Sequence, residues 1–174
     1  MQAKKFQRCD NAVKLKQPLE KLWEEAIPKD CKVVVIYSSL IHFIFPLVGL
    51  KEVLVDSFLT LGAKGLTLAF PAFNFGFCQG TPYHYNNSKS QTGVLANWIL
   101  ESKGVKRTPH PIYSFALIGP QADQLMACEN ITTFGSGSTF EFFENQNAEI
   151  IMFGCGWDSC SQFHRYEELN KVPY

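Results

Sequence analysis

A short apolar strand, an amphipathic helix and a second apolar strand follow one another early in the chain, and this order constrains the fold more than any other feature. Val33–Tyr37 is apolar and β-branched without alternation, which is typical of a parallel strand covered on both faces. The stretch from Leu50 to Leu61 carries apolar residues at helical spacing and is closed by Gly62, and Leu66–Phe70 is a second strand that Pro71 stops. We therefore expect a right-handed βαβ crossover.

Further strands and helices alternate along the rest of the chain. An amphipathic helix from Leu15 to Ile27 ends before Pro28 and precedes the first strand. Ser138 with Glu141 and Ser159 with Gln162 match the capping-box pattern at two helix starts. The other expected elements are a helix at 94–99, a strand at 114–118, a short helix at 121–128 and a strand at 149–153. The alternation predicts an α/β fold, which we expect to be one domain of residues 1–174.

Composition and charge exclude several classes of protein. With 46% hydrophobic residues in 174, the chain can bury a sizeable core, which excludes a mainly disordered protein. Its 16 Lys and Arg balance 16 Asp and Glu, so no long-range field attracts nucleic-acid phosphate or anionic lipid. The first residues lack the apolar core of a signal peptide, and no apolar run reaches the roughly 18 residues of a membrane span. We expect a cytoplasmic protein without nucleic-acid or membrane partners.

Six cysteines are scattered along the chain, and we expect free thiols, because a cytoplasmic chain of this size does not need disulfides to fold. Cys155, Cys160 and His164 have the side-chain types of a zinc site, but the chain has no CxxC pair, so no metal is expected. Cys160 with His164 is a second candidate, as a thiol nucleophile and its base. The default for Cys155, between two glycines after a strand, is a small buried apolar residue.

His164 and Glu167 lie three residues apart on the last predicted helix, so both side chains share one face. A carboxylate at this spacing can orient the imidazole, which is the arrangement of a general base. The alternative is a surface histidine in a charged helix, since Arg165 and Glu168 are adjacent. Spacing alone leaves both interpretations open.

Two stretches combine hydroxyl groups with backbone N–H groups at the ends of elements. Gly135–Ser138 at a helix start suits either a phosphate cradle or a plain helix cap. Ser38 and Ser39, after the first strand, allow the same two interpretations. His110, between two prolines, is a pocket residue or a turn residue, and the polar stretch 74–92 predicts a functional loop.

Taken together, six pieces of the chain resemble the aminoglycoside 3-N-acetyltransferase family, also called the antibiotic N-acetyltransferase family. The likeness spans about Leu19 to Tyr174. The matching pieces occur in the family's order, and they are Tyr37–Leu40, Gly65–Phe73, Thr92–Leu95, Gly104–Pro111 running into Ser114–Ala116, Phe134–Ser138, and Gly154–Ser159 leading to His164–Glu168.

The resemblance implies a three-layer α/β/α sandwich with a largely parallel central sheet, and transfer of an acetyl group from acetyl-CoA to an amine of an aminoglycoside or amino sugar. It implies His164 as the catalytic base with Glu167 as its partner, and direct transfer without a metal. Substrate-binding roles are expected for His110 and Asp158. The residues expected to bind coenzyme A are Ser38, Ser39, Arg107, Thr108, Gly135, Ser136, Gly137 and Ser138.

The chain departs from the family in two ways. Tyr37 stands where many members have His before the Ser-Ser-Leu sequence. Family members also continue beyond the length of this chain, so we expect the N-terminal two thirds of the family fold, truncated at the C-terminus. The acceptor is an antibiotic if the protein serves resistance, or an amino sugar if it serves polysaccharide biosynthesis, and both roles stay open. The alternatives are a non-catalytic paralogue that binds coenzyme A, and a hydrolase that uses Cys160 or a serine with His164.

Overall fold

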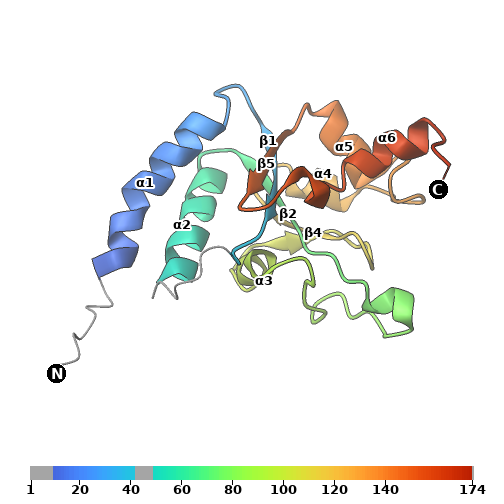
Figure 1. Cartoon of the computed structure of the whole chain (residues 1–174), viewed down its shortest axis with the longest axis horizontal. Coiled ribbons are helices and arrows are strands. Elements are labelled where there is room, and N and C mark those ends of the chain that lie inside the picture. Colours follow the sequence, from blue (N-terminus) through green and yellow to red (C-terminus); the bar gives the residue numbers. More distant parts are fainter. Residues whose placement is uncertain (1–9, 42–48, 174) are drawn as a thin grey trace.

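A five-stranded sheet in the order β3-β4-β2-β1-β5 forms the centre of the computed structural model, which describes residues 10–41 and 49–173 (Figure 1). β1 pairs in parallel with β2 and with β5, whereas β4 runs antiparallel to β2 and to β3. The α/β prediction is therefore confirmed, with a mixed sheet in which β4 opposes the common direction. The strands are β1 Val33–Ser38, β2 Thr67–Pro71, β3 Lys106–Arg107, β4 Phe115–Ile118 and β5 Glu149–Phe153.

Helices cover both faces of the sheet, as a three-layer sandwich requires (Figure 1). α1, α2 and α3 pack on one face, and α4 and α5 pack on the other. None of the helices within the described ranges is long and apolar enough to cross a membrane. The helices are α1 Asp10–Ala26, α2 Leu50–Ala63, α3 Val94–Leu100, α4 Ala122–Met126, α5 Thr139–Asn145 and α6 Phe163–Leu169, with short 3-10 turns η1 Gly76–Gln79 and η2 Trp157–Ser159.

The apolar run of β1 supplies side chains to both layers. Val34 and Ile36 belong to the core under α1–α3, whereas Val33, Val35 and Tyr37 belong to the core under α4 and α5. All five are at most 2% exposed. Fully burying one such aliphatic side chain stabilises the fold by roughly 1.5–3 kcal/mol. The alternation brings Tyr37 to the layer that also contains Cys160, three residues before α6.

Three local predictions differ from the structure. Gly62 was predicted to end the second helix, but α2 continues through Gly62 to Ala63. Glycine at this position makes room for the Ile118 side chain, because a Cβ at Gly62 would lie 2.3 Å from the Ile118 Cγ2. The last helix begins at Phe163, and Ser159 ends η2 instead. The predicted capping box there is wrong, since the Gln162 side chain donates to the Phe140 carbonyl at 3.0 Å.

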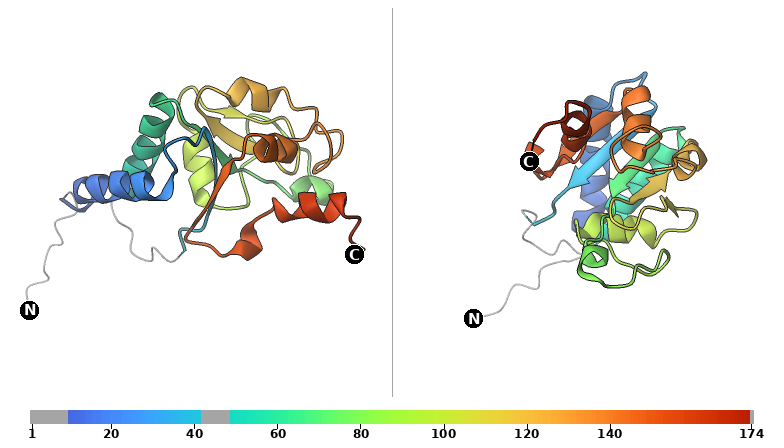
Figure 2. Two further views of the ribbon diagram at one scale, coloured as in Figure 1. Left: turned by 90° about the horizontal axis from the view of Figure 1, so that it is seen from above. Right: turned by 90° about the vertical axis from the view of Figure 1, so that its right-hand side faces the viewer.

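α6, which carries His164, lies at the opposite end of the molecule from α1, as Figure 1 and the left view of Figure 2 both show. β5 leads toward it through η2. The segment that follows β5 therefore links the edge strand of the sheet to the His164 helix.

Candidate active site

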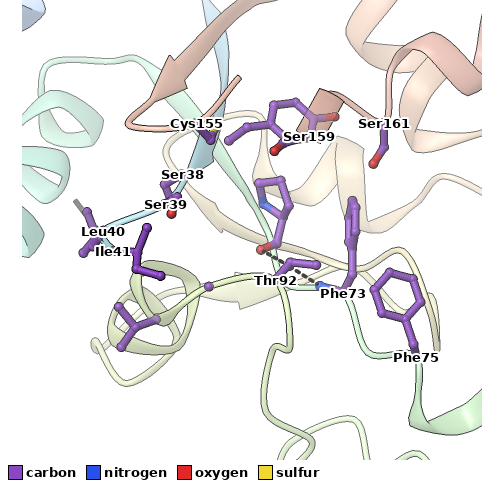
Figure 3. A pocket seen from close by; sticks show the side chains of 14 residues that line it. Ser38, Ser39, Leu40, Ile41, Phe73, Phe75, Thr92, Cys155, Ser159 and Ser161 are labelled. Carbon is purple, nitrogen blue, oxygen red and sulfur yellow. Dashed lines mark hydrogen bonds between the residues drawn. The ribbon is translucent and has the colours of Figure 1, made fainter. Parts of the chain in front are cut away.

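A cleft of about 660 Å³ opens where β1, β2 and β5 end (Figure 3). These three strands run parallel, so their carboxyl ends meet at one edge of the sheet. Open α/β sheets bind ligands at this edge. The cleft is lined by Tyr37–Ile41 after β1, Pro71, Phe73 and Phe75 after β2, Thr92–Val94 before α3, and Cys155, Ser159 and Ser161 after β5.

The lining of this cleft is rich in hydroxyl groups, and none of the lining residues in the described part of the chain has a charged side chain. Hydroxyls come from Ser38 and Ser39 on one side and from Ser159 and Ser161 on another (Figure 3). Aromatic and aliphatic side chains supply the rest of the wall. Such a lining suits a neutral ligand that carries hydrogen-bonding oxygens or amides. Sequence reasoning missed Ser159 and Ser161, because their position depends on where η2 turns the chain.

Ser38 and Ser39 reach the cleft because β1 is paired up to its last residue. Ser38 is in register with Phe153 of β5, and the Ser39 N–H donates to the Phe153 carbonyl at 3.0 Å. Gly93 has a φ of 130°, and a Cβ there would lie 3.2 Å from the Ser38 carbonyl oxygen. Both serines line the cleft, and their predicted contact with coenzyme A stays a prediction. Residues 42–48, which follow this segment, lie outside the described ranges, so the turn or helix cap predicted at Ser38 and Ser39 stays a prediction.

His164 and Glu167 form the pair that their spacing predicts. The His164 Nδ1 lies 2.6 Å from the Glu167 Oε2 on α6, and the two side chains are 46% and 37% exposed. A carboxylate at Nδ1 favours the tautomer with the proton on Nδ1, which leaves the Nε2 lone pair available. The ring is therefore oriented and accessible, as a general base must be.

The loop before α5 supports the His164 ring. The Phe134 ring lies 5.3 Å from the His164 ring, measured between centroids. Arg165, which is 5% exposed, donates through Nη1 to the Phe134 carbonyl at 2.7 Å. Its other nitrogens bind Glu144 at 2.5 Å and Glu141 at 3.1 Å. These contacts tie α6 to α5 and to the loop.

The Gly135–Ser138 loop is a helix cap in this structure. The Gly135 N–H donates to the Thr132 hydroxyl at 2.9 Å, the Gly137 N–H to the Glu141 carboxylate at 2.8 Å, and the Glu141 N–H to the Ser138 hydroxyl at 3.1 Å. The hydrogen bond from Gly137 is the main cause that lowers the pKa of Glu141, and Arg165 adds to it. The Glu141 carboxylate accepts from Gly137, and side-chain hydroxyls accept from Gly135 and Glu141, so these three N–H groups cap α5. The predicted binding of coenzyme A by Gly135–Ser138 stays a prediction.

His110 holds a turn together. Its Nδ1 accepts hydrogen bonds from the N–H groups of Ile112 at 3.0 Å and Tyr113 at 2.9 Å, so the ring proton is on Nε2, which lies 3.2 Å from the Thr133 hydroxyl. Burial lowers the pKa of His110 and favours this neutral form. His110 thus stabilises the turn, and its predicted contact with the substrate stays a prediction.

Arg107 is the last residue of β3, and Thr108 follows it at the start of the turn to β4. Arg107 is 5% exposed, donates to the Ser114 hydroxyl at 2.9 Å and the Ala72 carbonyl at 2.7 Å, and also bonds to the Ser88 carbonyl. The Thr108 hydroxyl accepts from the Phe115 N–H at 2.8 Å. Burial lowers the pKa of Arg107. These contacts fix the 74–92 loop and β4. The predicted contact of Arg107 and Thr108 with coenzyme A stays a prediction.

The cysteines give little support to thiol or zinc chemistry. Cys160 is 5% exposed, and burial raises the pKa of its thiol. Cys155 is half-buried and lines the cleft, so it is more open than predicted, and burial raises its pKa too. Among residues 10–41 and 49–173, no group of three His, Cys, Asp or Glu side chains could hold a metal ion. A thiol with a raised pKa is a poor nucleophile.

Asp158 lies in η2, between β5 and α6, and its side chain is exposed. Its Oδ1 folds back over Gly156, where a Cβ would lie 2.5 Å away. The next residue, Ser159, lines the cleft. The predicted contact of Asp158 with an acceptor stays a prediction.

Comparisons with solved structures show the same fold. Aminoglycoside acetyltransferase AAC(3)-IVa aligns with a TM-score of 0.76 at 24% identity, over 91% of this chain and 61% of that chain. The structure described as AAC-IIIb binary with CoASH aligns with a TM-score of 0.74 at 15% identity, over 88% of this chain and 64% of the other. The chain thus spans less than two thirds of either solved chain.

Sequence comparison identifies the family. Aminoglycoside N(3)-acetyltransferase III of Serratia marcescens is 28% identical over 82 residues, which make up 47% of this chain and 30% of the relative. The family model described as aminoglycoside 3-N-acetyltransferase matches residues 45–174, which is most of the chain and includes the His164 pair. The chain therefore belongs to the aminoglycoside 3-N-acetyltransferase family.

Proposed function

We propose that the protein transfers an acetyl group from acetyl-CoA to an amine of an aminoglycoside or amino sugar, in the cytoplasm, as part of a single acetyltransferase domain. The observation that carries this proposal is the 2.6 Å contact between the His164 Nδ1 and the Glu167 Oε2 on an exposed face of α6. It gives the chain an oriented imidazole on the helix that follows Ser161, a residue of the cleft whose lining suits the donor.

His164 acts as a general base in direct transfer. Its Nε2 takes a proton from the acceptor amine, whose nitrogen attacks the thioester carbonyl carbon. The carbon–sulfur bond then breaks, and the proton passes to the departing thiolate. Glu167 accepts the Nδ1 proton in a hydrogen bond and stabilises the positive charge that the imidazole gains. A positioned base of this kind contributes about 10²–10⁴ in rate.

The uncharged cleft supports the donor assignment. Coenzyme A carries a neutral arm with two amides, and the hydroxyls of Ser38 and Ser39 and the aromatic wall of Phe73 and Phe75 suit such an arm. One structural neighbour is described as binary with CoASH. The protein's cleft would hold the arm, and the acyl group would point toward α6.

The acceptor proposal depends on the family and on local charge. Structural neighbours are described as sisomicin bound and as in complex with apramycin. In this chain, Asp158 in η2 is exposed, and the Glu167 carboxylate lies beside His164 in α6. Carboxylates attract an amine in its protonated, cationic form, which is the form that arrives from solution before deprotonation. We propose an amine on an aminoglycoside or an amino sugar as the acceptor.

Mass spectrometry of an amine panel tests this function. The 174-residue chain is incubated with acetyl-CoA and with aminoglycosides and amino sugars in parallel, and products heavier by one acetyl group are expected. Release of free acetate without an acetylated amine would instead indicate the hydrolase. Binding of coenzyme A without any product would indicate the non-catalytic paralogue.

A further inference from the structure

A second cavity, of about 700 Å³, adjoins the candidate active-site cleft at Val94, which lines both and is 42% exposed. The second cavity is lined by residues 85–89 of the 74–92 loop, by α3 with Glu101 after it, and by residues 105–107 at β3. It therefore joins the cleft on the α3 side, whereas Ser159 and Ser161 line the cleft on the side of the chain that leads into α6.

Hydrogen bonds tie the walls of the second cavity together. The Asn97 side chain accepts from the Ser90 N–H at 2.8 Å and donates to the Ser90 carbonyl at 3.1 Å, which fixes the 74–92 loop against α3. The Tyr85 hydroxyl donates to the Arg107 carbonyl, which fixes the same loop against β3. The cavity is thus preformed, as binding sites for small molecules usually are.

The charge of the second cavity differs from that of the cleft. Among its lining residues in the described part of the chain, Lys89, Lys106 and Arg107 are basic and Glu101 alone is acidic. Glu101 is paired with Lys51, which is not a lining residue, and this pair is the main cause that lowers the Glu101 pKa. The lining therefore carries an excess of positive charge, which favours an anionic ligand.

Two of the three basic side chains keep their charge available to a ligand. Lys106 is paired with Asp123, outside the lining. Arg107 is 5% exposed, and the hydrogen bonds of its guanidinium go to two carbonyl oxygens and one hydroxyl, which are neutral. Lys89 is exposed in the 74–92 loop. An anion in the cavity would therefore meet the Lys89 ammonium directly and the field of Arg107 from within the wall.

Two aromatic side chains complete the second cavity. Trp98 of α3 is half-buried, and Tyr85 comes from the 74–92 loop. Nucleobases stack on aromatic rings, and ammonium and guanidinium groups bind phosphate oxygens. Aromatic and cationic groups in one preformed cavity fit a nucleoside that carries phosphate groups.

We propose that the second cavity binds the phosphorylated nucleoside end of the acyl-thioester donor, with Lys89 in contact with a phosphate, while the neutral arm passes Val94 into the cleft. This inference rests on the proposed function and adds a separate subsite to it. The described lining of the cleft has no charged side chain that could neutralise phosphate, whereas the adjoining cavity has an excess of basic ones.

Calorimetric titration of the 174-residue chain tests this subsite, with coenzyme A and adenosine 3′,5′-bisphosphate as probes. The bisphosphate is the phosphorylated nucleoside end without the neutral arm. Lys89→Ala is expected to weaken both probes about tenfold, because one charge-assisted phosphate contact is lost. Lys89→Arg keeps the charge and is expected to stay within about threefold of wild type.

Lys103→Ala is the matched control. Lys103 is exposed and follows α3 closely in the chain, but it is not among the residues that line the second cavity. This variant is expected to keep the wild-type affinity for both probes. Replacing either exposed lysine is expected to leave the melting temperature unchanged, so a loss of affinity in Lys89→Ala reports on the ligand.

Each other outcome overturns a defined claim. If coenzyme A binds wild type and Lys89→Ala equally, the subsite is wrong and the proposed function stands. If Lys89→Ala weakens coenzyme A but not the bisphosphate, the nucleoside end binds elsewhere and the subsite is again wrong. Binding of the bisphosphate that depends on Lys89, in a chain that acetylates no amine, keeps the subsite and overturns the proposed function. Absence of binding of either probe to folded wild type at millimolar concentration overturns both.

Discussion

The Arg165 guanidinium holds Phe134 against His164: its Nη1 donates to the Phe134 carbonyl at 2.7 Å, and the Phe134 and His164 rings lie 5.3 Å apart. Arg165 follows His164 directly in α6, a helix of only 7 residues. A helix this short gains little stability from its own hydrogen bonds. The orientation of the His164 ring therefore depends on contacts that Arg165 makes outside α6.

Replacing Arg165 by Met is expected to lower the free energy of unfolding by about 2–4 kcal/mol, because hydrogen bonds to Glu141, Glu144 and two carbonyls are lost from a buried position. Urea denaturation measures this. Lys21→Met is the control, since Lys21 is exposed and lies 3.6 Å from Glu25 in a surface pair of little weight. Wild-type stability of the Arg165→Met variant would contradict the anchoring role.

His110 is expected to make stability depend on pH. Burial lowers its pKa in the folded protein, whereas the unfolded chain takes up a proton near the ordinary value of about 6.5. The unfolded state therefore binds more protons below that pH, and the free energy of unfolding falls as the pH drops from 7.5 to 5.5. His110→Asn reduces this slope and lowers stability at pH 7.5, through loss of the contact with Thr133.

Chemical denaturation at the two pH values tests the effect of His110. His84→Asn provides the comparison, because His84 is exposed in the 74–92 loop. If His110→Asn keeps the full wild-type loss of stability between pH 7.5 and 5.5, a different group causes it.

Elements defined by local periodicity could be predicted from the sequence. β1 and β5 match the expected strands closely, because uninterrupted apolar runs specify them without help from distant contacts. The His164 and Glu167 pair was found for a similar reason, since helical spacing alone brings the two side chains to one face.

Features that depend on tertiary contacts could not be predicted. β3 has two residues and no pattern of its own, and it exists because the chain turns back through residues 108–114 to pair it with β4. The Gly135–Ser138 loop has the composition of an anion site, but Glu141 takes its Gly137 N–H group. Arg107 is basic and yet buried, because carbonyls from two other segments accept its hydrogen bonds.

Glu167→Gln is expected to slow acetyl transfer by about tenfold, less than loss of the histidine itself. The glutamine oxygen still accepts the Nδ1 proton and keeps the tautomer, but it cannot stabilise the imidazolium charge. Steady-state kinetics with saturating acetyl-CoA measure the change. Glu20→Gln, on the exposed side of α1 at the other end of the molecule, is the matched control and keeps wild-type turnover.

Direct transfer requires no thiol, so a Cys155→Ala, Cys160→Ala double variant is expected to keep turnover within about threefold of wild type. Loss of the buried Cys160 side chain lowers the free energy of unfolding by about 1 kcal/mol. Intact-protein mass spectrometry during turnover is the second measurement. An acetyl adduct on either cysteine, together with ping-pong kinetics, would move the mechanism to nucleophilic catalysis.

The most direct test of the account is the turnover of His164→Ala, measured with its affinity for coenzyme A across pH 6 to 9. The account predicts that turnover falls at least about 100-fold, because the amine loses its base, while donor affinity stays within about twofold of wild type. Wild-type turnover of His164→Ala over that pH range would contradict it, and His164 would then be a surface residue of α6.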